Sequence, residues 1–232
     1  MAKKKTTRKE LLKSPDEFLT LSSRAANFAR EHAQLFQYVG IGIVCIILIY
    51  LGVNTYINYV NRKGQEAFDA ALVSFGEEMK DFDKKGNLKK TEEEFETVED
   101  KYGRARVSGL VPSELAYIKY LEKNYDKAIP LYQEYLKSLP KNSPYRSLAR
   151  LALAACYEEK GEYAKAAEIL NTVLAASKDT FKEQAMLSLA RVYRLEGKTQ
   201  ESKKVLTEFL EKYKSSPFVP LAKAHLEQHS RS

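Results

Sequence analysis

The segment Leu153-Ala-Ala-Cys-Tyr-Glu-Glu-Lys-Gly-Glu-Tyr-Ala-Lys-Ala166 recurs 36 residues later as Leu189-Ala-Arg-Val-Tyr-Arg-Leu-Glu-Gly-Lys-Thr-Gln-Glu-Ser202. In both copies a leucine and an alanine precede a tyrosine by four and three positions, and a glycine follows that tyrosine by four. Residues at these spacings share one face of a helix, and a glycine suits the turn after it. The repetition therefore predicts an array of helical pairs.

A third, less regular copy begins 38 residues before the first of these two. Lys123-Asn124 stands where the other copies have the glycine of the turn, and Pro130 falls one turn into the expected second helix. Small residues recur where neighbouring helices must approach each other. They are Ala116, Ala154 and Ala190 in the first helices, and Ala128, Ala166 and Ser202 in the second helices.

These features resemble the tetratricopeptide repeat, a helix–turn–helix unit of about 34 residues. The resemblance implies an all-α solenoid with repeats at about 109–146, 147–182 and 183–216. Ser143-Pro144 and Ser216-Pro217 are typical of helix starts and agree with this division. Residues 217–228 are expected to form the closing helix that such an array needs.

Residues 61–105 carry a more degenerate helical pair. Its first helix is expected to continue out of the preceding segment through Phe68 and Phe75, and the break between the helices falls at residues 83–87. Thr91-Glu-Glu-Glu94 has the spacing of a capping box, which predicts that the second helix begins there.

No Asp, Glu, Lys or Arg occurs between residues 32 and 61. About 20 helical residues cross a hydrocarbon core of about 30 Å, so this run predicts a transmembrane helix at residues 35–60. The alternatives are a buried core helix and a cleaved signal peptide, whose apolar region is about 7 to 15 residues long. The longer apolar run here, with tyrosines at both ends, favours an uncleaved signal anchor.

The charges that flank this run predict its orientation. Residues 1–31 contain eight Lys or Arg, whereas residues 62–81 contain three. Because positively charged flanks stay in the cytoplasm, we expect residues 1–34 to form a basic cytoplasmic tail. The domain of residues 61–232 is then periplasmic, if the membrane is a bacterial inner membrane. Ser14-Pro-Asp-Glu17 predicts the start of an amphipathic helix on the cytoplasmic membrane surface.

The positive charge of the chain is mostly a property of the tail. The whole chain has 38 Lys plus Arg against 31 Asp plus Glu, and the part after residue 31 has 30 against 27. We therefore expect no nucleic-acid partner for the domain. The tail itself suits anionic lipid head groups, while ribosomal RNA, a cytoplasmic partner or a purely topogenic role remain alternatives.

The residues of catalytic and metal sites are scarce. The histidines are His32, His225 and His229, and the last two make a weak metal site without cysteines or clustered carboxylates nearby. The cysteines are Cys45 in the apolar run and Cys156 in the repeats, where a small buried residue is expected. The sequence predicts no enzyme, no cofactor and no metal site.

Tetratricopeptide arrays expose a groove lined mainly by their first helices, and the resemblance implies which residues line it here. They are Leu110, Ser113, Tyr117 and Tyr120, then Leu148, Leu151, Ala155 and Glu158, then Gln184, Leu187, Arg191 and Arg194. Tyrosine and leucine offer apolar anchors, and arginine offers forked donors for carboxylates. We expect a groove for extended or helical segments of other proteins, with core packing as the alternative role for some leucines.

The complete layout, a basic tail, one span and an array of about three to four repeats, resembles the YfgM-like ancillary subunits of the bacterial Sec translocon. The resemblance implies a non-enzymatic, membrane-anchored adaptor whose partners are the translocon, a membrane-anchored periplasmic chaperone and newly exported proteins. A scaffold subunit of another envelope machine is the alternative, for example in outer-membrane assembly, a pilus or secretion system, or cell division.

Overall fold

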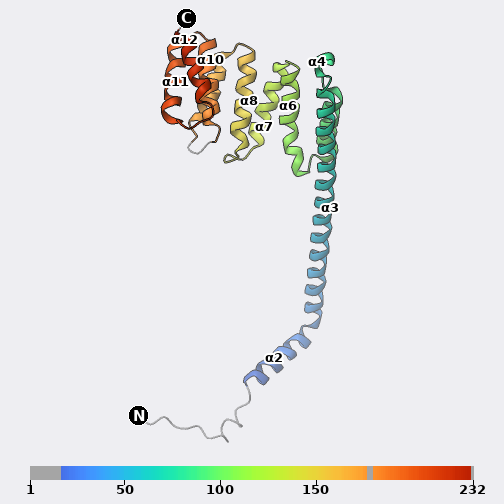
Figure 1. Cartoon of the computed structure of the whole chain (residues 1–232). Helices are drawn as coiled ribbons and strands as arrows, with labels where there is room; N and C mark the ends of the chain where they lie inside the picture. The colour runs from blue at the N-terminus through green and yellow to red at the C-terminus, as the bar shows by residue number, and fades with distance from the viewer. Residues whose placement is uncertain (1–16, 177–179, 231–232) are drawn as a thin grey trace, which may run out of the picture. The chain divides into compact units, whose positions relative to one another are not determined.

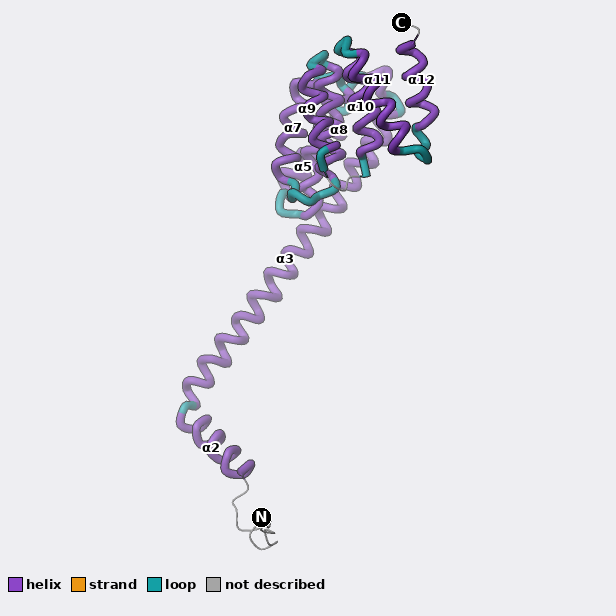
Figure 2. Tube along the Cα trace, turned by 90° about the vertical axis from the view of Figure 1, so that its left-hand side faces the viewer, coloured by secondary structure: helices purple, strands orange, loops and turns teal. Residues whose placement is uncertain are grey.

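The structure is a computed structural model that describes residues 17–176 and 180–230. It divides into two compact units, Met1–Asn58 and Tyr59–Ser232, which are described separately below. Every regular element among the described residues is a helix (Figure 2). The prediction of an all-α chain is therefore confirmed for these residues.

The first unit contains α2 (Glu17–Glu31) and the beginning of α3 (Ala33–Met79). The predicted helix start at Ser14 lies outside the described residues, apart from Glu17 itself. By length and composition α3 qualifies to cross a membrane, and none of its most apolar stretch is buried. Packing against the described residues therefore does not account for these apolar side chains.

Helix α3 has 47 residues and continues without a break past the end of the uncharged run. The expected continuation through Phe68 and Phe75 is thus confirmed. Its last turns bury Gly64, Phe68, Ala71 and Ser74 in the second unit. One helix therefore supplies both the apolar run and the first helix of the helical domain.

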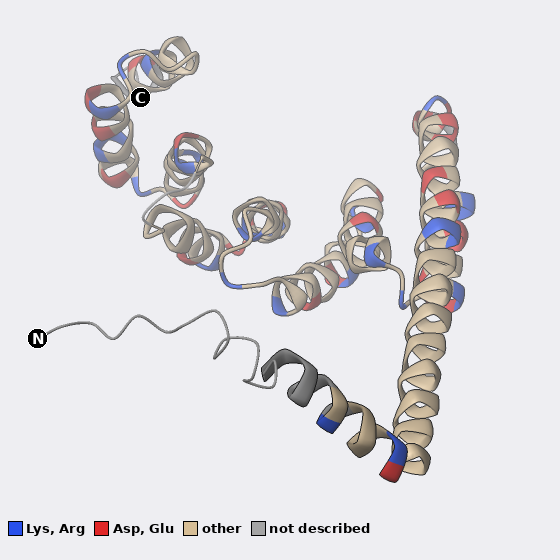
Figure 3. Cartoon of the chain, turned by 90° about the horizontal axis from the view of Figure 1, so that it is seen from below, with Lys and Arg blue, Asp and Glu red and all other residues tan. Residues whose placement is uncertain are grey.

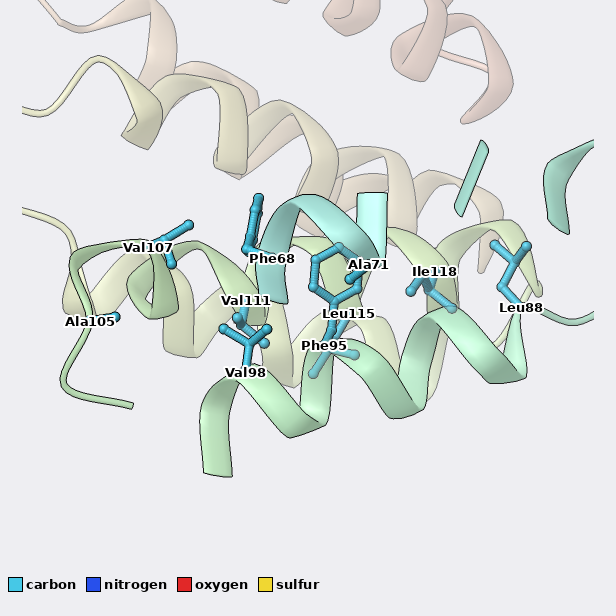
Figure 4. Close-up of a cluster of buried hydrophobic side chains, with 10 residues drawn as sticks. All are labelled: Phe68, Ala71, Leu88, Phe95, Val98, Ala105, Val107, Val111, Leu115 and Ile118. Atoms are coloured by element: carbon cyan, nitrogen blue, oxygen red, sulfur yellow. The ribbon is translucent and has the colours of Figure 1, made fainter. Parts of the chain in front are cut away.

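The second helix of this first pair is α5 (Lys89–Tyr102), which follows the short α4 (Phe82–Lys85). The rings of Phe68 and Phe95 meet edge to face with centroids 5.2 Å apart. They belong to a core that α3 and α5 share with the 3₁₀ helix η1 (Arg106–Leu110) and with α6 (Val111–Leu121), as Figure 4 shows. Gly64 permits this packing, because a Cβ there would lie 2.5 Å from the Cβ of Ala105.

The predicted capping box at Thr91 is wrong. Helix α5 begins two residues earlier, at Lys89, and Thr91 is fully buried inside it. Its backbone N–H and its hydroxyl donate to the Glu78 carboxylate of α3, at 2.9 and 2.8 Å. A carboxylate from another helix therefore binds the free N–H groups and the positive end of the α5 dipole.

A buried lysine joins this first pair to the repeats. The Nζ atom of Lys119 in α6 donates to Glu92 at 2.6 Å and to Glu122 at 3.0 Å. Burial alone would lower the pKa of Lys119, but the hydrogen bonds to both carboxylates outweigh burial and raise it. The ammonium group therefore stays charged and holds α5 against α6.

Six helices follow α6 in the order of the predicted repeats (Figure 1). They are α7 (Tyr125–Ser138), α8 (Tyr145–Glu159), α9 (Tyr163–Leu174), α10 (Lys182–Leu195), α11 (Thr199–Lys212) and α12 (Val219–Ser230). Each helix packs against the next one along the chain, so the second unit is a solenoid. Figure 3 shows these helices from below, with Lys, Arg, Asp and Glu distributed along them.

The six small residues that the sequence placed at helix contacts are all buried. Ser202 also uses its hydroxyl, which donates to the backbone oxygen of Ala190 at 2.7 Å and joins α11 to α10. Pro130 lies inside α7, and the helix continues through it. The side chains at the contacts therefore set how closely successive helices approach each other.

The turns between paired helices require a left-handed backbone. Gly161 and Gly197 have φ angles of 73° and 82°, as expected for the glycine of each turn. In the first copy Lys123 adopts this conformation with φ 57°, although it has a Cβ. Asn124 then caps α7, since its side-chain oxygen accepts a hydrogen bond from the N–H of Lys127 at 3.3 Å.

Replacing Gly64 by Ala should lower the free energy of unfolding by about 1–3 kcal/mol, because the added methyl group overpacks the contact with Ala105. Gly76→Ala in the same helix is the matched control, since its Cβ would meet nothing within 4 Å. The control should be neutral or stabilising by up to ~1 kcal/mol. Urea unfolding of the full chain in detergent measures both values, and equal effects would contradict the close approach at Gly64.

Replacing Lys123 by Gly should raise the free energy of unfolding by about 1 kcal/mol, because glycine adopts a positive φ without a steric cost. The control is Lys137→Gly in α7, where the same replacement in a helix should cost about 1 kcal/mol. Thermal unfolding, monitored by circular dichroism, measures the stability of both variants against that of the wild type. A loss of stability at both positions would show that Lys123 is not strained.

Candidate functional site

The residues predicted to line a groove lie on α6, α8 and α10, the first helices of the three repeats, with Leu110 directly before α6. Leu110 packs against the core of the first pair. The Ser113 hydroxyl donates to the backbone oxygen of Leu110 at 2.7 Å. These two residues therefore contribute mainly to the local structure at the start of α6.

Tyr117 and Tyr120 differ in their surroundings. Tyr117 is exposed and its ring lies 6.0 Å from that of Phe75 in α3. Tyr120 is half-buried beside Tyr125, with ring centroids 5.7 Å apart. Tyr117 thus exposes part of its ring at the surface, whereas the ring of Tyr120 packs against that of Tyr125.

The leucines of α8 also separate into two kinds. Leu148 is 48% exposed, whereas Leu151 is 8% exposed and belongs to the core shared by α8, α9 and α10. Ala155 is half-buried. Of these three residues, Leu148 alone presents a large apolar side chain to the surface.

Two of the predicted residues bind each other. Arg191 Nε donates to Glu158 Oε1 at 2.8 Å, and its Nη2 donates to Oε2 at 3.0 Å. This two-pronged ion pair joins α10 to α8 and fixes the orientation of the Arg191 guanidinium. Arg194 lies one turn further along α10, and none of the described carboxylates pairs with it.

The four predicted residues of α10 line one cavity of about 440 Å³. Its wall consists of Gln184, Leu187, Ser188, Ala190, Arg191 and Arg194 of α10, Ser202 and Leu206 of α11, and Phe218, Leu221 and His225. The size is within the range of small ligand pockets. The residues of α6 and α8 named above are not part of this cavity.

Seven residues of the cavity wall are not among the predicted groove residues, and three of these, Phe218, Leu221 and His225, belong to α12 or directly precede it. The sequence predicts only a closing helix for residues 217–228, yet these three side chains line the cavity. Their spacing of three and four residues places them on one helical stripe, which was a readable signal. Phe218 is 41% and Leu221 47% exposed, so this stripe is not a core contact.

His225 lies close to the two arginines. Burial, followed by the charges of Arg194 and Arg191, lowers the pKa of His225 below its ordinary value. The imidazole therefore stays neutral at neutral pH, and the positive charge of the cavity comes from the arginines. The side chain of His229 lies outside the described residues.

The buried cysteine of the repeats, Cys156, does not line this cavity. Burial raises the pKa of the Cys156 thiol to about 12, so it is inert and packs in the core as predicted. No metal-binding group of three or more His, Cys, Asp or Glu side chains occurs among the described residues. The cavity thus combines apolar walls with guanidinium donors, which suits binding.

Comparisons with known proteins agree with this architecture. Residues 119–190 match one model of the tetratricopeptide repeat, and residues 184–216 match a second. No curated protein matches the chain.

Solved structures show the same fold. The chain is similar to a crystal structure of nearly identical tetratricopeptide-like repeats from a protein of Podosopora anserina described as a kinesin light chain. The TM-score is 0.56 at 19% identity, over 72% of this chain and 85% of that one. A variant of the same protein gives a TM-score of 0.56 at 19% identity, over 72% and 84% of the two chains. The chain therefore carries tetratricopeptide repeats, which generally mediate protein–protein interactions, and no catalytic family is indicated.

Proposed function

We propose that this chain is a membrane-anchored adaptor that binds segments of other proteins and has no enzymatic activity. The observation that carries the proposal is the cavity between α10 and α12, where apolar walls lie beside the arginines of α10. Tetratricopeptide repeats generally serve protein–protein interactions, which supports this use of the cavity.

The chemistry of the wall favours an apolar side chain next to a carboxylate. Leu187, Leu206 and the exposed Leu221 provide apolar contacts. Arg194 can donate two parallel hydrogen bonds to a carboxylate, and Arg191 keeps its position because Glu158 holds it. A short acidic and apolar segment of a partner protein matches these donors and walls.

The unburied apolar stretch of α3 supports membrane anchoring. None of the residues that the structure describes packs over this stretch, and its length fits a hydrocarbon core of about 30 Å. The basic residues of the tail favour an N-terminus in the cytoplasm and a periplasmic array, in a bacterial inner membrane. Anchoring would raise the effective concentration of the array beside other membrane proteins.

Among membrane partners we favour the Sec translocon, a membrane-anchored periplasmic chaperone and newly exported chains. The similarity in layout to YfgM-like subunits supports this choice. The alternative is a scaffold role in another envelope machine. The cross-linking experiment below distinguishes the two by the proteins that it identifies.

The proposed topology is tested with spheroplasts. Protease added from outside should digest the array of residues 61–232 and leave an N-terminal epitope intact, because the basic tail favours the cytoplasm. Immunoblots against both ends follow the digestion. An array that survives while a known periplasmic protein is digested would contradict the topology.

The proposed binding site is tested with a photo-reactive amino acid at Leu221, which is exposed and lines the cavity. Irradiation of intact cells should give protein adducts, and mass spectrometry should identify subunits of the translocon or the chaperone in them. Arg194→Ala should reduce these adducts on the order of tenfold, because it removes charged hydrogen bonds to the ligand.

Two controls keep this experiment specific. The same photo-reactive residue at Glu168, exposed on α9, should give few adducts, and Lys137→Ala in α7 should leave the adducts at Leu221 unchanged. Equal adducts at both positions would refute the cavity as the binding site. Adducts with subunits of another envelope machine would support the scaffold role.

A further inference from the structure

The turn that follows α5 is fixed beside the first residues of the second unit. The backbone N–H of Arg106 donates to the side-chain oxygen of Asn61 in α3 at 2.9 Å. Ala105 occupies the space above Gly64, and Val107 is buried next to the same glycine. Residues 105–107 therefore lie directly beside residues 61–64 of α3, although the two segments are about 40 positions apart in the sequence.

Basic residues gather in these two segments. Residues 59–64 and 101–110 together contain five Lys or Arg and no Asp or Glu. We call these residues the basic turn surface: Arg62, Lys63, Lys101, Arg104 and Arg106. All are exposed except Lys63, which is half-buried.

Most of this charge is unpaired among the described residues. Lys63 binds Glu66 at 2.6 Å, and Arg62 lies 3.9 Å from the same carboxylate. None of the described carboxylates forms an ion pair with Lys101, Arg104 or Arg106. Three exposed cationic groups therefore remain available for an external anion.

The position of this surface along the chain indicates what that anion is. The uncharged run ends at Asn61, and α3 continues through it without a break. Asn61 follows Ile57, the last isoleucine of the run, by four helical positions, a rise of about 6 Å, and Val60 between them packs against the core of the second unit. Tyr56 and Tyr59 are exposed there, as in the aromatic belts of membrane proteins. Charges at this distance from a hydrocarbon core lie at the level of lipid head groups.

We propose that the basic turn surface binds the phosphate groups of anionic phospholipids in the leaflet that faces the array. The inference rests on the membrane anchoring proposed above. Guanidinium groups bind phosphate oxygens in a two-pronged geometry, which suits Arg104 and Arg106. The attraction acts within about one Debye length of the surface, so the turn must lie beside the residues that end the uncharged run, and its contacts with Asn61 and Gly64 hold it there.

The experiment uses the full chain in nanodiscs of equal parts phosphatidylglycerol and phosphatidylcholine. The chain is released into the gas phase, and native mass spectrometry measures the ratio of the two lipids that remain bound. The wild type should prefer phosphatidylglycerol, and R104Q/R106Q should reduce this preference on the order of fivefold for each arginine. The basic tail is the same in both proteins, so its contribution to lipid binding does not affect the comparison between them.

The matched control is K127Q/K137Q, which removes two exposed positive charges from α7. It should keep the lipid preference of the wild type, and both double variants should melt at the same temperature as the wild type. An unchanged preference in R104Q/R106Q, or an equal loss in the control, would overturn the inference. A chain that does not enter nanodiscs of any composition would instead refute membrane anchoring itself.

Discussion

The close approach of neighbouring helices is the constraint on which the second unit depends. Ala116, Ala154 and Ala190 in the repeats, and Gly64 before them, stand where a larger side chain would force two helices apart. A helical pair cannot bury its apolar face alone, so each pair needs its neighbour at this distance. The cores, the ion pairs between repeats and the shape of the cavity all follow from this spacing.

The sequence could predict two kinds of feature: those in which a residue determines its own backbone conformation, and those in which the same contact recurs in each repeat. Gly161 and Gly197 are of this kind. The start of α5 was mispredicted because its N–H groups are bound by Glu78 of another helix, and a local capping pattern contains no such information. Lys123 shows the opposite case, in which the turn keeps its left-handed shape although the sequence lacks glycine.

The site was only partly predictable, for a related reason. The repeat positions identified the residues of α10 that line the cavity. They did not predict the ion pair between Glu158 and Arg191, because an ion pair between repeats depends on rotamers as well as on register. The sequence predicted α12 only as the closing helix, although Ala222 belongs to the core and Leu221 lines the cavity. Leu151 was predicted for the groove and is core, since adjacent stripes of a first helix serve both purposes.

The cavity lies at the C-terminal side of the described array, and one of its walls comes from α12, the last helix that the structure describes. Helix α12 packs mainly on α11, and no further repeat covers it among the described residues. End helices of a solenoid open locally at a lower free energy than central ones. A ligand that contacts both α10 and α12 therefore stabilises the state in which α12 is packed on the array. Ligand binding and the packing of α12 are then thermodynamically linked.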